Sequence, residues 1–552
     1  MKNLMFSMLA GDGQDYKTTR GTETMYQTRK FHTLSFIAAL AASAVMACHA
    51  FAQSTPGYNN KIPDAILTPD TVETRIGTLK FFDGSPTRDT VELVYDNLDF
   101  MRGVETFLNG MPATSIEGLR LGQAELGATD FNHVVIFDDL MDSDPIFLTG
   151  NTDTVYALAF FDLKKDGPIV VEVPKGSGPG TVNDAFFRFV IDMGAPGPDK
   201  GKGGKYLLLP PEYDGPLEAP IGGKEQDVKV NGSTEKMFVT QSPSYVNWLI
   251  LRGFLVDGKP DAAAAMFRNG IKIYPLAKAA NPPAMKFFNG SKKSFNTVHA
   301  NNFEFYHELA HVIEREPVGL IDPELRGLFA SIGIEKGKKF APDDRMRKIL
   351  EEAVAVGNAT ARAIWIRSRD EEAYFYKDSG WYTGFVGGNH EFLKNGGSGG
   401  RNLDARVLFH YMATVITPAM VNKMVGAGSQ YALLNVDKNG EYVDGSKTYK
   451  LNIPADVPAK DFWSIVAYDP QTRSQLQTSQ PFPGRNNQRH KLDINEDGSV
   501  DLYFAPKVPK GKEANWIQTV AGKGWFIALR LYGPLDPWFD KEWQPGEIEL
   551  VE

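Results

Sequence analysis

Residues His307 to His311 spell His-Glu-x-x-His, a pattern that matches a known catalytic motif. On an α-helix the two histidines lie on one face, where both imidazoles can reach a zinc ion while Glu308 acts as general base. The motif predicts a zinc metallohydrolase. A catalytic zinc normally has three protein ligands, so Glu324, Glu335 or another domain would have to supply the third. Nothing else in the sequence requires a cofactor.

The helix that would carry this motif is amphipathic over residues 300–315. Its apolar side comprises Phe303, Phe305, Tyr306, Leu309, Ala310, Val312 and Ile313. Its opposite side comprises Glu304, His307, Glu308, His311, Glu314 and Arg315. A charged face opposite the core-facing stripe is normally in contact with water. The competing interpretation is therefore a solvated surface helix.

A second group of polar side chains stands between two apolar runs. Asn151, Asp153, Thr154 and Tyr156 offer amide, carboxylate and hydroxyl groups within six residues. Alternate side chains of an extended segment share a face, so these groups could converge on a ligand. The alternative is a turn that satisfies its own backbone.

Aromatic and basic side chains near the end of the chain are further candidates. Trp463 and Arg473 lie close together in the sequence and are candidate ligand-binding residues. Tryptophan on a β-sandwich can stack on a sugar ring. Tryptophan in a β-sandwich more often fills the core. We expect a small-molecule or glycan-like ligand, with core packing as the alternative.

The N-terminal residues predict export. Arg29 and Lys30 precede an apolar run over 34–47, and Ala50 and Ala52 stand where a signal peptidase reads small residues. The run is too short for a comfortable membrane span. We expect a cleaved signal over 1–52 and a periplasmic or secreted protein without a transmembrane segment in the mature chain.

Two details of this segment bear on processing. Met25 stands just before the basic residues and is the expected natural start. Cys48, the chain's one cysteine, lies within the signal, so lipid anchoring through this residue is the alternative to cleavage after Ala52.

Composition limits the classes of partner. The chain has 552 residues, of which 42% are hydrophobic and 23% are charged, with a net charge of -9. This is typical of a globular protein of two or three domains. The chain has no excess of basic residues that would bind a phosphate backbone, so we expect no nucleic-acid partner. A homo-oligomer is left open.

Hydrophobic periodicity divides the chain into successive regions. Helical spacing over 87–108 predicts an amphipathic helix that Asn109-Gly110 ends. Short apolar runs between Val134 and Val239 indicate a β-sandwich, and helical patterns return from about Pro243 to Arg367. A Gly-rich loop follows over 387–400. Hairpin turns ending at Gly440 and Gly498 indicate a final β region.

Several motifs, in order, resemble those of a bacterial family pair. The N-terminal ones lie at 63–78, 148–156 and 167–174, and the C-terminal ones at 461–469, 471–474, 497–499, 515–517 and 530–534. The first group resembles the domain of unknown function 1254, and the second resembles its usual partner, the domain of unknown function 1214. The resemblance implies an N-terminal β-sandwich, a helical middle domain and a C-terminal jelly-roll-like sandwich. It implies no activity and no zinc motif at His307.

These observations predict a mainly β protein with a helical middle domain. The expected parts are a signal region (1–52), an extension with an amphipathic helix (53–125), a β-sandwich (126–250), a helical domain (251–385), a Gly-rich loop with a connecting helix (386–430) and a jelly-roll-like domain (431–552). The leading functional hypothesis is an exported protein that binds, and in one version hydrolyses, a small or carbohydrate-like ligand in an interdomain cleft. The alternatives are the zinc metallohydrolase and a non-catalytic envelope or assembly protein.

Overall fold

The computed structural model describes residues 62–551. The expected signal region, with Met25 and Cys48, lies outside these residues. The chain separates into two compact units, one up to Glu92 and one from Leu93 onward. In the first unit, β1 (Thr71–Thr74), β2 (Gly77–Phe82) and β3 (Ser85–Pro86) form a small antiparallel sheet.

In the second unit, the first two sheets along the chain form the N-terminal sandwich. The six-stranded sheet has the order β14-β4-β5-β12-β7-β8, and the five-stranded sheet has the order β10-β11-β9-β6-β13. The strands of the first sheet are β4 (His133–Ile136), β5 (Thr154–Asp162), β7 (Pro179–Asp184), β8 (Phe189–Gly194), β12 (Val246–Phe254) and β14 (Lys286–Asn289). Those of the second are β6 (Ile169–Val173), β9 (Gly204–Leu209), β10 (Lys224–Val230), β11 (Ser233–Gln241) and β13 (Lys272–Pro275).

Side-chain alternation along β5 shows how the six-stranded sheet is used on both faces. Val155, Ala157 and Ala159 pack into the core between the two sheets. Tyr156 and Leu158 point the other way, into a cluster that includes Ile116 and Leu119 of the long helix α1. The sheet therefore has an inner face in the sandwich and an outer face that other elements cover. Both faces being apolar explains why the strand lacks a polar alternation.

The sandwich extends past residue 243, where the sequence predicted helical structure. That prediction is wrong for Val246–Phe254, which is strand β12, hydrogen-bonded between β5 and β7. A strand that is buried on both faces reads as a continuous apolar run, and such a run cannot be distinguished from a buried helix by periodicity alone. Helical structure begins with α3 (Asp261–Gly270), which starts directly after Pro260.

Helix α1 (Arg88–Glu125) is longer than predicted. It continues through Asn109-Gly110, which the sequence analysis took as its end. The Nδ2 atom of Asn109 donates to the carbonyl oxygen of Glu105 at 2.7 Å within the helix. A Cβ atom at Gly110 would lie 2.8 Å from Cδ2 of Leu309. Gly110 therefore allows α1 and the helix of Leu309 to approach closely and does not end α1.

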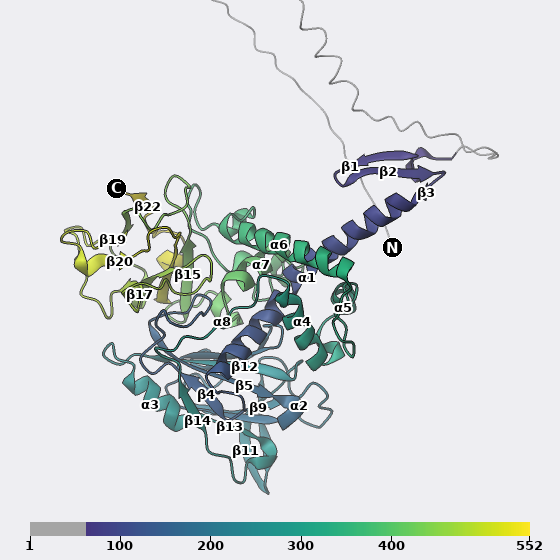
Figure 1. Ribbon diagram of the computed structural model, residues 1–552. Helices are drawn as coiled ribbons and strands as arrows, with labels where there is room; N and C mark the ends of the chain where they lie inside the picture. The colour runs from purple at the N-terminus through teal and green to yellow at the C-terminus, as the bar shows by residue number, and fades with distance from the viewer. Residues whose placement is uncertain (1–61, 552) are drawn as a thin grey trace, which may run out of the picture. The chain divides into compact units, whose positions relative to one another are not determined.

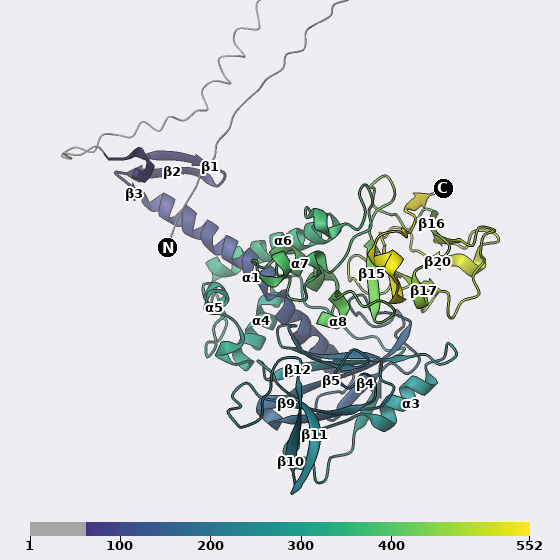
Figure 2. The ribbon, with the colours of Figure 1, turned by 180° about the vertical axis from the view of Figure 1, so that it is seen from behind.

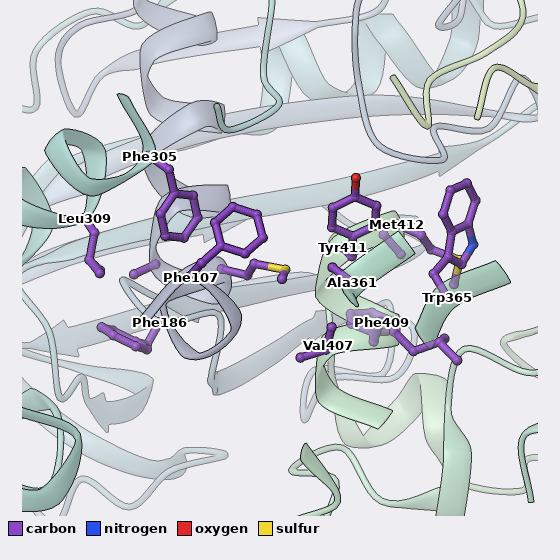
Figure 3. Close-up of a cluster of buried hydrophobic side chains, with 14 of the residues drawn as sticks. Phe107, Phe186, Phe305, Leu309, Ala361, Trp365, Val407, Phe409, Tyr411 and Met412 are labelled. Carbon is purple, nitrogen blue, oxygen red and sulfur yellow. The ribbon is translucent and has the colours of Figure 1, made fainter. Parts of the chain in front are cut away.

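The helical region packs around α1. It consists of α4 (Glu304–Arg315), α5 (Pro323–Ala330), α6 (Asp344–Ile366), α7 (Leu403–Met412) and the short α8 (Pro418–Val421). Figure 3 shows Phe107 of α1 beside Phe305 of α4, with ring centroids 4.4 Å apart. Trp365 of α6 and Tyr411 of α7 belong to the same cluster. Helix α6 begins after its N-cap Asp343, whose side chain accepts from the backbone amide of Met346.

The C-terminal sandwich consists of two four-stranded sheets, with the orders β15-β21-β17-β18 and β20-β19-β16-β22. Its strands are β15 (Ser429–Leu434), β16 (Tyr449–Ile453), β17 (Ala459–Tyr468), β18 (Gly484–Asn486), β19 (Val500–Ala505), β20 (Trp516–Gln518), β21 (Phe526–Pro534) and β22 (Ile548–Leu550). Gly440 and Gly498 both lie in turns and adopt positive φ values, as predicted. The turn at Gly440 is bridged by Val436 and Tyr442, whereas the turn at Gly498 leads into β19, whose partners are β16 and β20, so that it is no hairpin.

The mainly β fold with a helical middle region is therefore confirmed. Both views show α4 to α7 gathered beside the two sandwiches (Figure 1, Figure 2). Within residues 62–551, no helix combines the length and apolarity that crossing a membrane requires.

Candidate functional site: a cavity between the two sandwiches

The outer faces of two sheets, one from each sandwich, border a cavity. It has two arms that share five lining residues, namely Ile250, Arg252, Val415, Met420 and Tyr431. The arms hold about 670 and 620 Å³ of empty space, the mouth included. We call these two arms together the interdomain cavity.

The N-terminal sandwich contributes side chains from the outer face of its six-stranded sheet. Arg252 of β12 is the register partner of Tyr156 of β5, so both side chains stand on the same face. In the next row, Ile250 pairs with Thr181 of β7, and Thr181 in turn pairs with Asp192 of β8. All five side chains line the cavity.

The C-terminal sandwich contributes the corresponding face of its β15-β21-β17-β18 sheet. Tyr431 of β15 pairs with Arg530 of β21, and Leu433 pairs with Ala528. The neighbouring residues Ala432 and Leu529 alternate into the sandwich core. Alternation thus directs Tyr431, Arg530, Leu433 and Ala528 toward the interdomain cavity.

The segment that connects the helical region to the C-terminal sandwich closes a further wall. Its lining side chains are apolar with two exceptions, Thr414 and Thr417; the apolar ones include Phe409, Met412, Ala413, Val415, Met420 and Met424. Methionine side chains adapt to irregular apolar shapes, which suits a binding wall. Most of the lining is therefore apolar.

Polar groups converge where the two arms meet. The Nη1 atom of Arg252 donates a hydrogen bond to the hydroxyl of Tyr431 at 3.2 Å, which links the two sandwiches directly. The guanidinium of Arg252 also lies over the ring of Tyr156, 5.5 Å from its centroid. Burial alone would raise the pKa of Tyr431, but the nearby charges of Arg252 and Arg530 hold it below its ordinary value.

One acidic group lines the first arm. Asp192 is 9% exposed and accepts a hydrogen bond from the hydroxyl of Thr417 at 3.2 Å. Burial raises the pKa of this carboxyl to about 6, although the hydrogen bond opposes the shift. Asp192 can therefore exchange a proton near neutral pH, as a group at an acid–base site would.

Two of the predicted polar candidates line the cavity. Asn151 and Tyr156 are lining residues of the second arm, and Nδ2 of Asn151 donates to the Tyr156 hydroxyl at 2.7 Å. The Oδ1 atom of Asn151 accepts from the backbone amides of Asp153 and Thr154 at 2.9 and 3.0 Å. Asn151 therefore also forms the turn that satisfies its own backbone, which was the alternative to a ligand-binding role.

Asp153 and Thr154 are buried beside the cavity without lining it. The Oδ1 atom of Asp153 accepts a hydrogen bond from Nδ2 of Asn486 at 2.8 Å. Its Oδ2 accepts from the hydroxyl of Tyr532 at 3.3 Å. Since Asn486 and Tyr532 belong to the C-terminal sandwich, Asp153 holds the two sandwiches together at this point.

Trp463 and Arg473 lie outside the cavity lining. Trp463 is 4% exposed and packs in the core of the C-terminal sandwich. Arg473 is fully buried and donates to the carbonyl oxygens of Tyr411 at 3.1 Å and Gln471 at 2.7 Å. Both side chains are placed for packing between elements.

The His-Glu-x-x-His segment lies on α4, far along the chain from the cavity-lining strands. Its predicted apolar stripe is confirmed, with Leu309 and Val312 fully buried. The ring of His307 packs edge-on against Phe340 at a centroid distance of 5.2 Å, and His311 is exposed. Glu335 pairs with Lys338. Among the described residues, no three His, Cys, Asp or Glu side chains are grouped to hold a metal ion.

Glu308 departs from the predicted solvent face. Both of its carboxylate oxygens accept from the backbone amide of Ala300, at 3.2 and 3.1 Å. Burial raises its pKa to about 8, and the charges of Glu304 and Glu117 act in the same direction. The carboxyl of Glu308 therefore binds the backbone of the segment that precedes α4.

The sequence did not point to Arg252, which lines both arms of the cavity, or to Arg530, which lines the second arm. A signal for both exists, because each arginine interrupts an otherwise apolar strand, in Trp248–Phe254 and in Phe526–Tyr532. Charged residues are rarely buried without a partner. The signal at Arg252 was lost because its strand was taken for helix.

Comparison with known proteins agrees with this division of the chain. Residues 131–275 match the family model described as "Protein of unknown function (DUF1254)", and residues 428–536 match "Protein of unknown function (DUF1214)". No curated protein matches the chain.

Two solved structures are similar to parts of it. The VPA0106 protein from Vibrio parahaemolyticus is 15% identical with a TM-score of 0.49, and the match covers 82% of this chain and 100% of that one. An uncharacterized protein from Burkholderia cenocepacia is 12% identical with a TM-score of 0.34, and the match covers 83% of this chain and 96% of that one. The two family models match the N-terminal and C-terminal sandwiches, so the chain carries a DUF1254 domain followed by a DUF1214 domain.

Proposed function

We propose that this protein binds a small, mainly apolar molecule in the interdomain cavity. The observation that carries the proposal is the lining, in which apolar side chains from both sandwiches and the connecting segment surround a few convergent polar groups. A largely apolar cleft between domains, with a few well-placed polar groups, is the usual form of a small-molecule site.

The composition of the lining favours an apolar ligand over a sugar. Sugar rings require many hydrogen-bonding partners and an aromatic surface for stacking. The tryptophan expected for that purpose, Trp463, packs in the sandwich core. Side chains such as Ile250, Met412 and Val415 instead offer dispersion contacts and no hydrogen bonds. The export signal expected over 1–52 would place this binding site outside the cytoplasm.

The test uses prodan, a neutral naphthalene dye whose emission shifts to the blue in apolar surroundings. We expect saturable binding to one site, which the variant Met420→Trp weakens at least tenfold because the larger ring fills the meeting point of the arms. Met346→Trp is the matched control, since Met346 on α6 is similarly half-buried and lies away from the cavity. Binding that is not saturable, or that both variants weaken equally, would overturn the proposal.

A further inference from the structure

Two arginines in the interdomain cavity lack the acidic partners that buried cations normally have. Arg530 is 3% exposed, and its Nη2 atom donates to the carbonyl oxygen of Thr149 at 2.8 Å. Its Nη1 atom is buried and finds no hydrogen-bond partner within residues 62–551. A guanidinium stays protonated in proteins, so this unpaired N–H belongs to a full positive charge.

Arg252 is the second cation, and it lines the same arm of the cavity as Arg530. Its one hydrogen bond to a side chain goes to the neutral hydroxyl of Tyr431. Tyr156 and Tyr431 are among the groups that act most strongly on the charges of both arginines, and neither arginine forms a salt bridge with a carboxylate in the described part of the chain. Asp192, the acid of the first arm, shows no influence from either arginine.

The surrounding rings compensate this charge only in part. The guanidinium of Arg530 lies 5.8 Å from the ring centroid of Tyr431 and 5.6 Å from that of Tyr468. Cation–π contacts are weaker than hydrogen-bonded ion pairs, and burying an uncompensated charge is costly. A bound anion would supply the missing partner and satisfy the free N–H of Arg530.

We infer that the ligand of the interdomain cavity carries a carboxylate, which Arg252 and Arg530 bind while the apolar lining holds its hydrocarbon part. This inference rests on the proposed binding function and specifies its ligand class as an amphiphilic monocarboxylate. The planar N–H arrays of arginine match the two oxygens of a carboxylate, so the arginines select this group over a neutral amide of the same shape.

The test compares octanoate with octanamide, which have the same carbon chain and differ in charge, by isothermal titration calorimetry on the purified protein. We expect octanoate to bind at least ten times more tightly than octanamide. Equal affinities with measurable binding would overturn the carboxylate inference and leave the binding function standing. Failure of octanoate, octanamide and prodan alike would overturn the binding function itself.

Substitutions of the two arginines test whether these residues cause the preference for octanoate. Arg252→Gln and Arg530→Gln should each bring the two affinities within about threefold, and Arg252→Lys should retain part of the preference. If Arg530→Gln does not fold, the inference is still tested by Arg252→Gln and by the comparison of octanoate with octanamide on the unaltered protein. Arg367→Gln is the matched control, because Nε of Arg367 also donates to a tyrosine hydroxyl, that of Tyr442 at 3.0 Å, outside the cavity. A preference that survives both cavity variants would contradict the assignment.

Discussion

Arg252 and Tyr431 lie 179 positions apart in the sequence, yet Nη1 of the arginine donates to the tyrosine hydroxyl at 3.2 Å. Arg252 belongs to the DUF1254 domain and Tyr431 to the DUF1214 domain. One hydrogen bond therefore joins the two domains at the point where the arms of the cavity meet. The proposed ligand site and the domain interface therefore share Arg252 and Tyr431.

Removing the hydroxyl of Tyr431 should destabilise the protein. In Tyr431→Phe the Nη1 atom of Arg252 loses its acceptor, and a charged donor left without a partner costs about 1–2 kcal/mol. Urea titration followed by tryptophan fluorescence measures this change. Tyr442→Phe removes a similar hydrogen bond at a side chain that is 58% exposed, and it should change stability by less than about 0.5 kcal/mol. Equal losses in the two variants would contradict the prediction.

Glu308 should make folding stability depend on pH. Its pKa is about 8 in the folded protein and 4.5 in its ordinary state. Because the folded value is the higher one, the folded protein retains the proton and the stabilisation is lost as pH rises from 4.5 through 8. Glu308→Gln keeps an acceptor for Ala300 and should be more stable than the unaltered protein above pH 8, by on the order of 3 kcal/mol.

Thermal unfolding across this pH range measures the effect of Glu308→Gln. The control is Glu352→Gln on the exposed side of α6, whose unfolding profile should follow that of the unaltered protein. A pH profile of Glu308→Gln that parallels the unaltered protein would show that Glu308 is ionised in the folded state throughout.

The His-Glu-x-x-His segment should not confer stoichiometric zinc. Glu308 is engaged by the amide of Ala300, and the His307 ring is packed against Phe340. Elemental analysis of protein purified without chelating resin should give well below one zinc per chain, unchanged in His307→Ala. One zinc per chain that disappears in His307→Ala would restore the metallohydrolase hypothesis.

Gly103 should be intolerant of a side chain, although alanine is the better helix former. A Cβ atom at Gly103 of α1 would lie 2.7 Å from the Cβ of Ala353 on α6, which cannot rotate away. Gly103→Ala should therefore lower the free energy of unfolding by about 1–3 kcal/mol. At Gly327 of α5 nothing lies within 4 Å, so Gly327→Ala should stabilise by about 0.5–1 kcal/mol. The same urea titration distinguishes the two signs.

Local sequence patterns determined those parts of the fold that depend on neighbouring residues. Asp343 specified the start of α6 by capping it, and Gly440 and Gly498 specified turns by their freedom to adopt positive φ. Local patterns gave a wrong prediction where tertiary packing determines the role of a residue. Asn109-Gly110 looks like a helix end, yet Gly110 is required by the close approach of Leu309.

The candidate site was predictable only in part. Asn151 and Tyr156 were recognised from their spacing and do line the cavity, because they flank the start of one strand. Asp153 and Arg473 could not be assigned from spacing, since their partners, Asn486 and the carbonyl oxygen of Tyr411, come from distant segments. Both side chains turned out to connect elements.

The sequence by itself determined the order of the sandwiches and the helical region, because period-two and period-3.6 patterns are properties of each segment alone. Only the tertiary structure decided where the chemistry lies. Arg252 belongs to β12 of the N-terminal sandwich and Arg530 to β21 of the C-terminal sandwich, and alternation in each strand directs its arginine toward the other sandwich. The cavity exists because two sheets, each with its inner face buried, leave their outer faces to meet.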